Sequence, residues 1–238
     1  MSSFHVDLKG QVAIVTGAAR DAGRASALAL ARAGAAICAV DVNPDRLDET
    51  AHLIESEGSR ALAWTGDVSN RFQVAALIEA TRDAFGGLHI VVNATSADRR
   101  AALLALDEYD WRRALEISLT GAFFCTQLAA RVMADEGGGT IINVLNTVGP
   151  LLTASEAASL AASQAGLHGL TRQAARELLG HGVRVNAVCA GSPTSPDSPP
   201  GHPVSWEDVA AAVLFLCSPG AAAITGQMLI VDGGSSLF

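Results

Sequence analysis

The chain has 238 residues, of which 50% are hydrophobic and 17% are charged. This length suits one large domain, and this composition allows a sizeable core. The net charge of −8 argues against nucleic acid as the main partner, and no uninterrupted apolar run is long enough to predict a membrane span.

The N-terminal sequence "MSSFHVDLKG" has no basic region followed by an apolar run, so it does not resemble a secretory signal. The four cysteines and six histidines lack the short spacing of a disulfide framework or a metal site. We therefore expect a cytoplasmic protein without a bound metal. The arginine pairs at residues 99–100 and 112–113 are interpreted as ordinary solvated helix faces.

Short β-branched runs alternate with helical patterns along the whole chain. Strands are predicted at residues 11–17, 35–42, 61–69, 89–95, 140–146, 183–191 and 228–234. Helices are predicted at residues 24–34, 44–58, 71–87, 107–134, 156–179 and 206–218. This alternation predicts one α/β domain over residues 1–238, a doubly wound parallel sheet with helices on both faces.

The stretch "TGAARDAG", residues 16–23, lies where the first strand meets the first helix. Gly17 and Gly23 would let the backbone approach a pyrophosphate at the helix N-terminus, although a plain tight turn is the alternative. Asp41 closes the second strand and could accept hydrogen bonds from both adenosine ribose hydroxyls, which favours NAD over NADP. Arg20 favours the opposite choice weakly, since a guanidinium here could meet a phosphate.

Eight segments resemble the short-chain dehydrogenase/reductase family over essentially the whole length: "VTGAARDAG", "GDVSN", "VVNAT", "W…ISLTGAFF", "GTIINV", "ASQAGLHGLTRQAARELLGHGVRVNAV", "EDVAAAVLFL" and "ITGQMLIVDGG". The resemblance implies a seven-stranded Rossmann domain, usually in a tetramer. It implies that Asp67 and Val68 contact adenine and that Asn93 lies beside the adenosine ribose. Two departures occur here: Asp21 replaces the middle glycine of the family's loop, and Thr95 replaces the glycine of its "NNAG".

The family's catalytic set is a tyrosine general acid/base, a lysine four residues later, a serine and an asparagine. A phenol has a reference pKa near 10, so it needs a neighbouring cation to work near neutral pH. By the resemblance these positions hold Leu160, Gln164, Asn146 and Ser118. The single tyrosine, Tyr109, is expected far from this site. The four changes together predict that hydride transfer has been lost.

The segment that covers the substrate in the family is reduced here to a Pro/Ser-rich stretch, about residues 192–205. A lid of this length cannot easily exclude water from a substrate pocket. Any NAD binding is expected to be weak, and the site is expected to be apo without added cofactor.

Small residues on the 156–179 helix would allow close packing with a second chain, namely Ala161, Ala162, Ala165 and Gly169. We therefore predict a non-catalytic structural or regulatory subunit. Its partner would be itself, in a dimer or tetramer, or an active homologue. The alternatives are an NAD(H)-dependent oxidoreductase with rearranged catalysis and a dinucleotide-binding sensor. A hydrolase would need Ser155 or Ser159 to converge with Glu156 and His168.

Overall fold

The computed structural model describes residues 6–191 and 204–237, which form one parallel sheet of seven strands with helices on both faces. The strand order is β3-β2-β1-β4-β5-β6-β7, which confirms the doubly wound prediction. The strands are β1 (Val12–Thr16), β2 (Ala36–Asp41), β3 (Ala61–Thr65), β4 (Ile90–Asn93), β5 (Gly139–Asn146), β6 (Val183–Ala190) and β7 (Met228–Val231). The central strands are nearly continuous buried runs, as expected for parallel strands covered on both faces.

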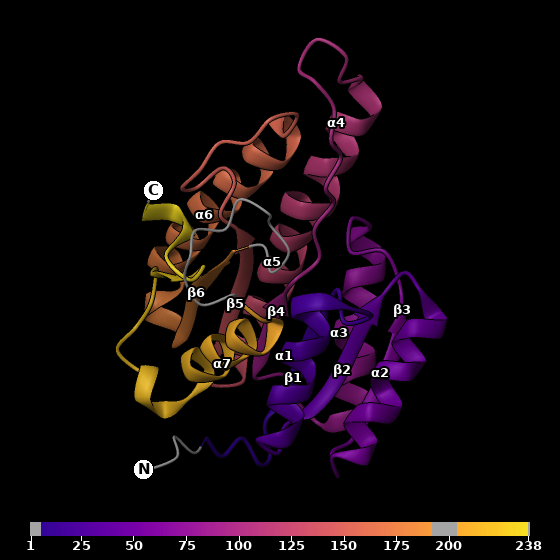
Figure 1. Cartoon of the computed structure of the whole chain (residues 1–238). Coiled ribbons are helices and arrows are strands. Elements are labelled where there is room, and N and C mark those ends of the chain that lie inside the picture. Colours follow the sequence, from indigo (N-terminus) through magenta and orange to yellow (C-terminus); the bar gives the residue numbers. More distant parts are fainter. Residues whose placement is uncertain (1–5, 192–203, 238) are drawn as a thin grey trace.

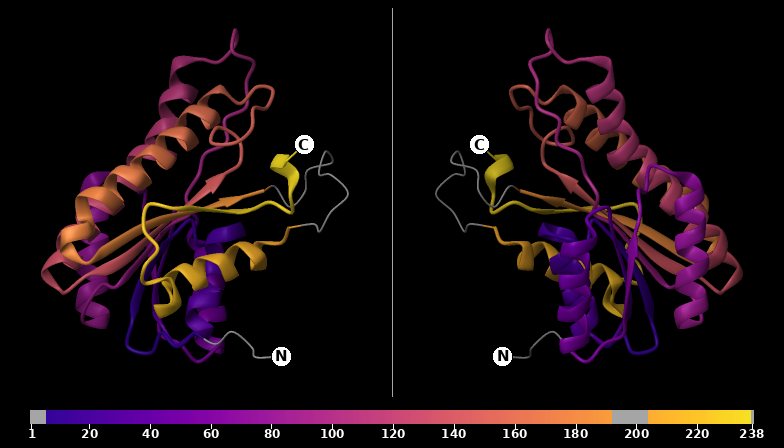
Figure 2. Two further views of the ribbon diagram at one scale, coloured as in Figure 1. Left: turned by 90° about the vertical axis from the view of Figure 1, so that its left-hand side faces the viewer. Right: turned by 90° about the vertical axis from the view of Figure 1, so that its right-hand side faces the viewer.

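Two layers of helices enclose the sheet (Figure 1; Figure 2). One layer contains α1 (Asp21–Arg32), α2 (Pro44–Ser56) and α7 (Trp206–Cys217). The opposite layer contains α3 (Arg71–Phe85), α4 (Glu108–Leu115), α5 (Gly121–Asp135) and α6 (Ala158–Leu178). Each layer shares its own apolar core with the face of the sheet that it covers.

The predicted helix at residues 107–134 is interrupted by a short π-helical segment, Glu116–Thr120, between α4 and α5. Such segments occur mostly as single turns inside α-helices and are frequent at functional sites. Ser118 lies within it and is buried. The helix predicted from residue 156 begins instead at Ala158, because Glu156 adopts a left-handed conformation with φ of 57°.

The continuous helical stretch Glu108–Asp135 is long and apolar enough to cross a membrane by length and composition alone. It packs against β4, β5 and α3 in this fold, and 44% of its most apolar window is buried. A core helix of a folded domain has the same composition, so this stretch is explained by its place against the sheet.

The strand order reverses direction between β1 and β4, and crossovers leave from these strands toward opposite faces of the sheet. Ligands of open α/β sheets bind in the crevice outside the carboxyl ends of the strands at such a point. The fold therefore places its candidate site beside the ends of β1, β2 and β4.

Candidate functional site

A cavity of about 340 Å³ lies at the carboxyl ends of the strands. Its lining includes Gly17, Arg20 and Asp21 from the β1–α1 turn, and Asp41 from the end of β2. The volume is at the lower end of the range for small-molecule sites, about 300–1,000 Å³.

The two glycines of the β1–α1 turn are required by its geometry. A Cβ at Gly23 would lie 2.1 Å from the Gly17 carbonyl oxygen, and one at Gly17 would lie 2.7 Å from the Ala94 oxygen. Gly17 also has a positive φ of 68°. The backbone therefore passes close to both neighbours, at positions where no side chain fits.

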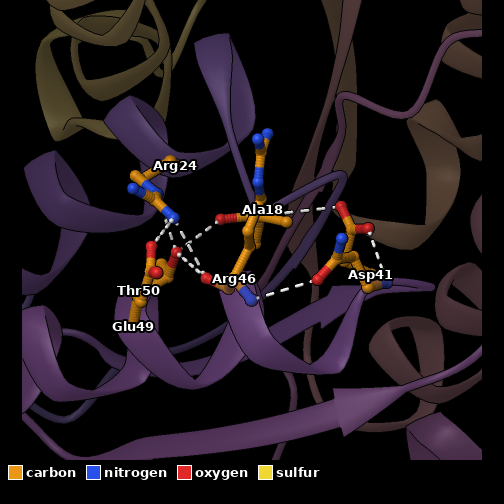
Figure 3. Close-up of polar contacts among 8 residues, drawn as sticks. Ala18, Arg24, Asp41, Arg46, Glu49 and Thr50 are labelled. Atoms are coloured by element: carbon orange, nitrogen blue, oxygen red, sulfur yellow. Dashed lines mark hydrogen bonds and ion pairs between the residues drawn. The ribbon is translucent and has the colours of Figure 1, made fainter.

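This turn is fixed from two sides by polar contacts (Figure 3). The Thr50 hydroxyl of α2 accepts from Arg24 Nε at 2.9 Å, and its proton is shared between the Ala18 carbonyl at 2.9 Å and the Arg46 carbonyl at 3.0 Å. Arg24 also donates to the Arg46 carbonyl and pairs with Glu49 at 3.1 Å. Because Thr50 is fully buried, this network holds the turn in place before any ligand arrives.

Asp41 fixes the other side of the turn. Its Oδ2 accepts from the Ala19 amide at 3.2 Å, and its Oδ1 accepts from the Asn43 amide at 3.1 Å (Figure 3). A carboxylate has about four lone-pair sites, so both oxygens can still accept from ribose hydroxyls. Asp41 thus lines the cavity with acceptor capacity to spare, and its contact with adenosine stays a prediction.

Asp21 occupies the left-handed region, with φ of 52°, at the first position of α1. This conformation explains why a glycine is usual at this position, since an L-residue is disfavoured there. Asp21 and Arg20 both line the cavity and lie 3.5 Å apart as an exposed ion pair. One negative and one positive side chain therefore flank the N-terminus of α1.

Asp67 and Val68 also line the cavity, as predicted for an adenine contact. Asp67 accepts from the Ser69 amide and hydroxyl and pairs with Arg113 at 3.3 Å. Burial would raise the pKa of the Asp67 carboxyl, but the bonds from Ser69 and Arg113 outweigh it and lower that pKa below its usual value.

Asn93, at the end of β4, points its side chain into the protein and not into the cavity. Its side chain is buried, with Nδ2 donating to Asn143 Oδ1 at 2.9 Å and lying 3.4 Å from Thr126 Oγ1. The neighbouring Ala94 and Thr95 line the cavity, whereas Asn93 does not. The Asn93 side chain therefore joins β4 to β5, and its place beside an adenosine ribose stays a prediction.

Asn146 and Gln164 meet at the other end of the cavity. Gln164 Oε1 accepts from the Asn146 amide at 2.8 Å, and Gln164 Nε2 lies 3.4 Å from Ser96 Oγ. The Asn146 carboxamide oxygen accepts from the Val148 amide at 2.8 Å. Gln164 is 1% exposed, so its side chain is a fixed part of the cavity wall.

Ser118 and Leu160, at the other two positions of the family's catalytic set, lie outside the cavity lining. Ser118 Oγ accepts from the Ala97 amide at 2.9 Å, and Leu160 is buried. The four positions thus carry one hydroxyl, two carboxamides and one hydrocarbon side chain. None of these groups is charged, and none titrates near neutral pH.

The residues considered for a hydrolase do not form a triad in the structure. The Ser159 hydroxyl donates to the Arg99 carbonyl, and Glu156 is exposed. Tyr109 is exposed on α4 and does not line the cavity. Within residues 6–191 and 204–237, no group of three or more His, Cys, Asp or Glu side chains could hold a metal ion.

Arg113 and Trp206 are the largest of the cavity residues that the sequence analysis did not predict. Arg113, predicted to be on a solvated face, lines the cavity and pairs with Asp67, so that prediction is wrong for this residue. Its contact with Asp67 joins segments 46 residues apart, so no local sequence signal could have found it. Trp206 lines the cavity from the start of α7, and no sequence signal distinguishes it. The predicted lid lies outside the described residues, except for its last two.

A family model described as short chain dehydrogenase matches residues 11–197, and one described as enoyl-(acyl carrier protein) reductase matches residues 192–236. The chain belongs to the short-chain dehydrogenase family. It is 38% identical to the cis-4-hydroxycyclohexanecarboxylate dehydrogenase of Sinomonas cyclohexanicum, covering 94% of this chain and 96% of that protein.

One further relative and one solved structure are also similar to this chain. It is 31% identical to the (2S)-[(R)-hydroxy(phenyl)methyl]succinyl-CoA dehydrogenase subunit BbsD of Thauera aromatica, covering 97% of this chain and 98% of that one. A short-chain type dehydrogenase/reductase structure from Mycobacterium marinum superposes with a TM-score of 0.92 at 31% identity, covering 96% of each chain. The relatives are named as oxidoreductases, and the family typically binds NAD(P).

The described residues of this chain fit only part of that cofactor. The glycine turn, Asp41 and Asp67 suit an adenosine diphosphate group. At the opposite end, Gln164 and Asn146 are bonded to the backbone and carry no charge. When bound, the nicotinamide group supplies hydride chemistry; among residues 6–191 and 204–237, the side chains that line that end carry no group that exchanges a proton near neutral pH.

Proposed function

We propose that the chain is a non-catalytic member of the short-chain dehydrogenase family that acts as a structural or regulatory subunit. The observation that carries this proposal is the Gln164–Asn146 contact, in which the side chain at the lysine position is bonded to the backbone of β5. A general acid/base needs a titratable group within reach of the substrate, and the uncharged residues at the family positions do not supply one.

Restoring one residue would leave the others unsuited to the reaction. Leu160 is buried in the fold and holds no exchangeable proton, and the Ser118 hydroxyl already accepts from the Ala97 amide. When several residues act together in catalysis, removing any one of them abolishes most of the reaction rate. We therefore expect no turnover after Leu160→Tyr and Gln164→Lys are introduced together.

Turnover of the purified chain tests the proposal. Oxidation and reduction are followed by nicotinamide absorbance with hydroxy- and oxo-cyclohexanecarboxylates and with 3-hydroxyacyl and 3-oxoacyl thioesters. A related reductase serves as the positive control. We expect no rate above the buffer blank with any substrate, and a clear saturable rate would contradict the proposal.

Assembly is the second part of the proposal. Leu229 and Ile230, neighbours on the edge strand β7, are 38% and 43% exposed and lie on opposite faces of the strand. Ala165 and Gly169 are exposed on α6. Exposed apolar strand edges and contiguous apolar faces favour association. One relative is named as a dehydrogenase subunit, which supports pairing with a different chain as well as with a second copy.

Light scattering tests this assembly. We expect a dimer or tetramer with two-fold symmetry, and we place the protein in the cytoplasm of its host. Ala165→Arg should reduce the size of the oligomer, because a guanidinium cannot be accommodated between closely packed helices. Asp45→Arg on the exposed first turn of α2 is the control and should leave the size unchanged. A monomeric native chain, or an oligomer unaffected by Ala165→Arg, would contradict this part.

The second candidate function is an NAD(H)-dependent oxidoreductase with rearranged catalysis. The names of the relatives favour it, since they describe dehydrogenases and reductases. The turnover assay distinguishes it from a non-catalytic subunit, and ligand titration distinguishes a dinucleotide sensor from a purely structural chain.

A further inference from the structure

The cavity has two chemically different ends. The charged side chains that line it are Arg20, Asp21, Asp41, Asp67 and Arg113, and all of them come from the β1–α1 turn, the ends of β2 and β3, and α4. The end beneath β5 and β6 is lined by Val144, Leu145, Asn146, Gln164, Ala190 and Trp206. Within the part of the chain that the structure describes, charged side chains therefore line only one end of the cavity.

The charged end is already organised in the absence of a ligand. The Ala18 carbonyl is held by the buried Thr50 hydroxyl, and the Ala19 amide is held by Asp41. These contacts keep the glycine turn at the N-terminus of α1 in one conformation (Figure 3). Because the Ala18 and Ala19 amides donate to Val40 and Asp41, a phosphate would meet the amides of the first turn of α1, which have no acceptor within the helix.

The uncharged end offers little to a second nucleotide. The Gln164 carbonyl oxygen accepts from the Asn146 amide, and its amide nitrogen is 3.4 Å from Ser96 Oγ. A ribose at this end would meet carboxamides that already have backbone partners. Neutral hydrogen bonds contribute about half as much as charge-assisted ones.

We infer that this cavity selects an adenosine diphosphate group and gains almost nothing from the nicotinamide nucleotide attached to it. The ligand class is thus any adenosine 5′-diphosphate, with or without a further substituent. This inference rests on the proposed non-catalytic function. Both assume that Gln164, at the family's lysine position, leaves the cavity without the charge that would make NAD bind more tightly than ADP.

Calorimetric titration of the purified chain tests the inference with ADP, ADP-ribose, NAD and nicotinamide mononucleotide. We expect the Kd values of ADP, ADP-ribose and NAD to agree within about threefold, which corresponds to a difference in binding free energy of about 0.65 kcal/mol. Nicotinamide mononucleotide should show no heat of binding at millimolar concentration. NAD binding about tenfold or more tighter than ADP, binding of the mononucleotide, or no binding of any adenosine ligand would overturn the inference.

Substitutions at the two ends of the cavity test, without measuring turnover, which part of the ligand each end binds. Asp41→Asn should weaken ADP and NAD equally, by about tenfold, because the variant keeps the side-chain size but loses a charged acceptor. Asp45→Asn, on the exposed first turn of α2, should leave both unchanged. Gln164→Lys should tighten NAD and leave ADP unchanged, and Gln164→Met should change neither.

The two proposals fail in different ways. Turnover by the native chain would remove the non-catalytic function whatever the affinities are. Tighter binding of NAD than of ADP without turnover would remove only the present inference. Titration of the native chain decides the question even if the Gln164→Lys variant does not fold.

Discussion

Thr50→Val tests the contact that holds the glycine turn. The substitution keeps the shape of the side chain and removes its hydroxyl. The Ala18 carbonyl loses the donor at 2.9 Å, and Arg24 Nε loses its acceptor. Ala18 and Thr50 are both fully buried, so water cannot replace this contact without a local opening of the turn.

The expected loss of stability follows from these two groups. Leaving a buried polar group without a partner costs about 1–3 kcal/mol. Arg24 retains the Arg46 carbonyl and Glu49, so most of the loss comes from the Ala18 carbonyl, and we expect about 2 kcal/mol in all. For a chain of this size, this corresponds to a fall in Tm of about 4–8 °C. ADP affinity should fall as well, because the turn is no longer fixed.

Urea unfolding and thermal melting measure this loss, with Thr81→Val as the matched control. Thr81 is also fully buried, but its hydroxyl donates to the Leu77 carbonyl one helical turn before it in α3 and otherwise meets only the weakly polar Cys38 thiol. Such a carbonyl already accepts a main-chain bond, so we expect a loss of about 0.5 kcal/mol or less. Equal effects of the two substitutions would refute the role assigned to Thr50.

Three further predictions concern single side chains. Asp21→Gly should change the free energy of unfolding by less than about 1 kcal/mol, because relief of the positive φ is offset by the higher entropy of the unfolded chain. In calorimetry at low salt it should tighten ADP binding several-fold, because a negative charge is removed. Unchanged affinity would argue against a phosphate site at this turn. Burial raises the pKa of the thiols of Cys38, Cys125, Cys189 and Cys217 to about 12. A thiol reagent at pH 8 should therefore react with fewer than one thiol per folded chain and with four in urea. One fast-reacting thiol in the folded chain would contradict this prediction. The lowered pKa of Asp67 contributes stability that is present above its unfolded value of 3.8 and is lost as pH falls through the folded pKa. Urea midpoints should therefore show Asp67→Asn less stable than the native chain at pH 7 and the difference shrinking below about pH 4, and a difference independent of pH would count against the Arg113 pair.

The fold could be predicted from the sequence because its signals are local and repeated. Each parallel strand is a short apolar run, and each helix has a periodic pattern or a capping residue, such as Asn43 before α2 and Asn70 before α3. Glycine positions were equally informative, since the turn at Gly17 and Gly23 has no space for a side chain.

The details of the site depend on contacts between distant segments, and the sequence does not encode these locally. Asn93 follows a strand as a ribose-contacting residue would, yet its side chain turns toward Asn143 on the neighbouring strand. In the sequence, Arg113 is one of two adjacent arginines on a predicted helix surface. Its ion pair with Asp67, 46 residues earlier, is visible only in the structure. The π-helical segment around Ser118 is a response to packing that no residue pattern predicted.

The most direct test of the central claim is turnover by the unmodified chain with NAD(H) and NADP(H), measured beside a variant that carries the family's set at all four positions: Ser118→Asn, Asn146→Ser, Leu160→Tyr and Gln164→Lys. The native chain is expected to show no rate above the buffer blank with any hydroxy or oxo substrate of the panel. A saturable rate of the native chain, proportional to protein concentration, would contradict the account.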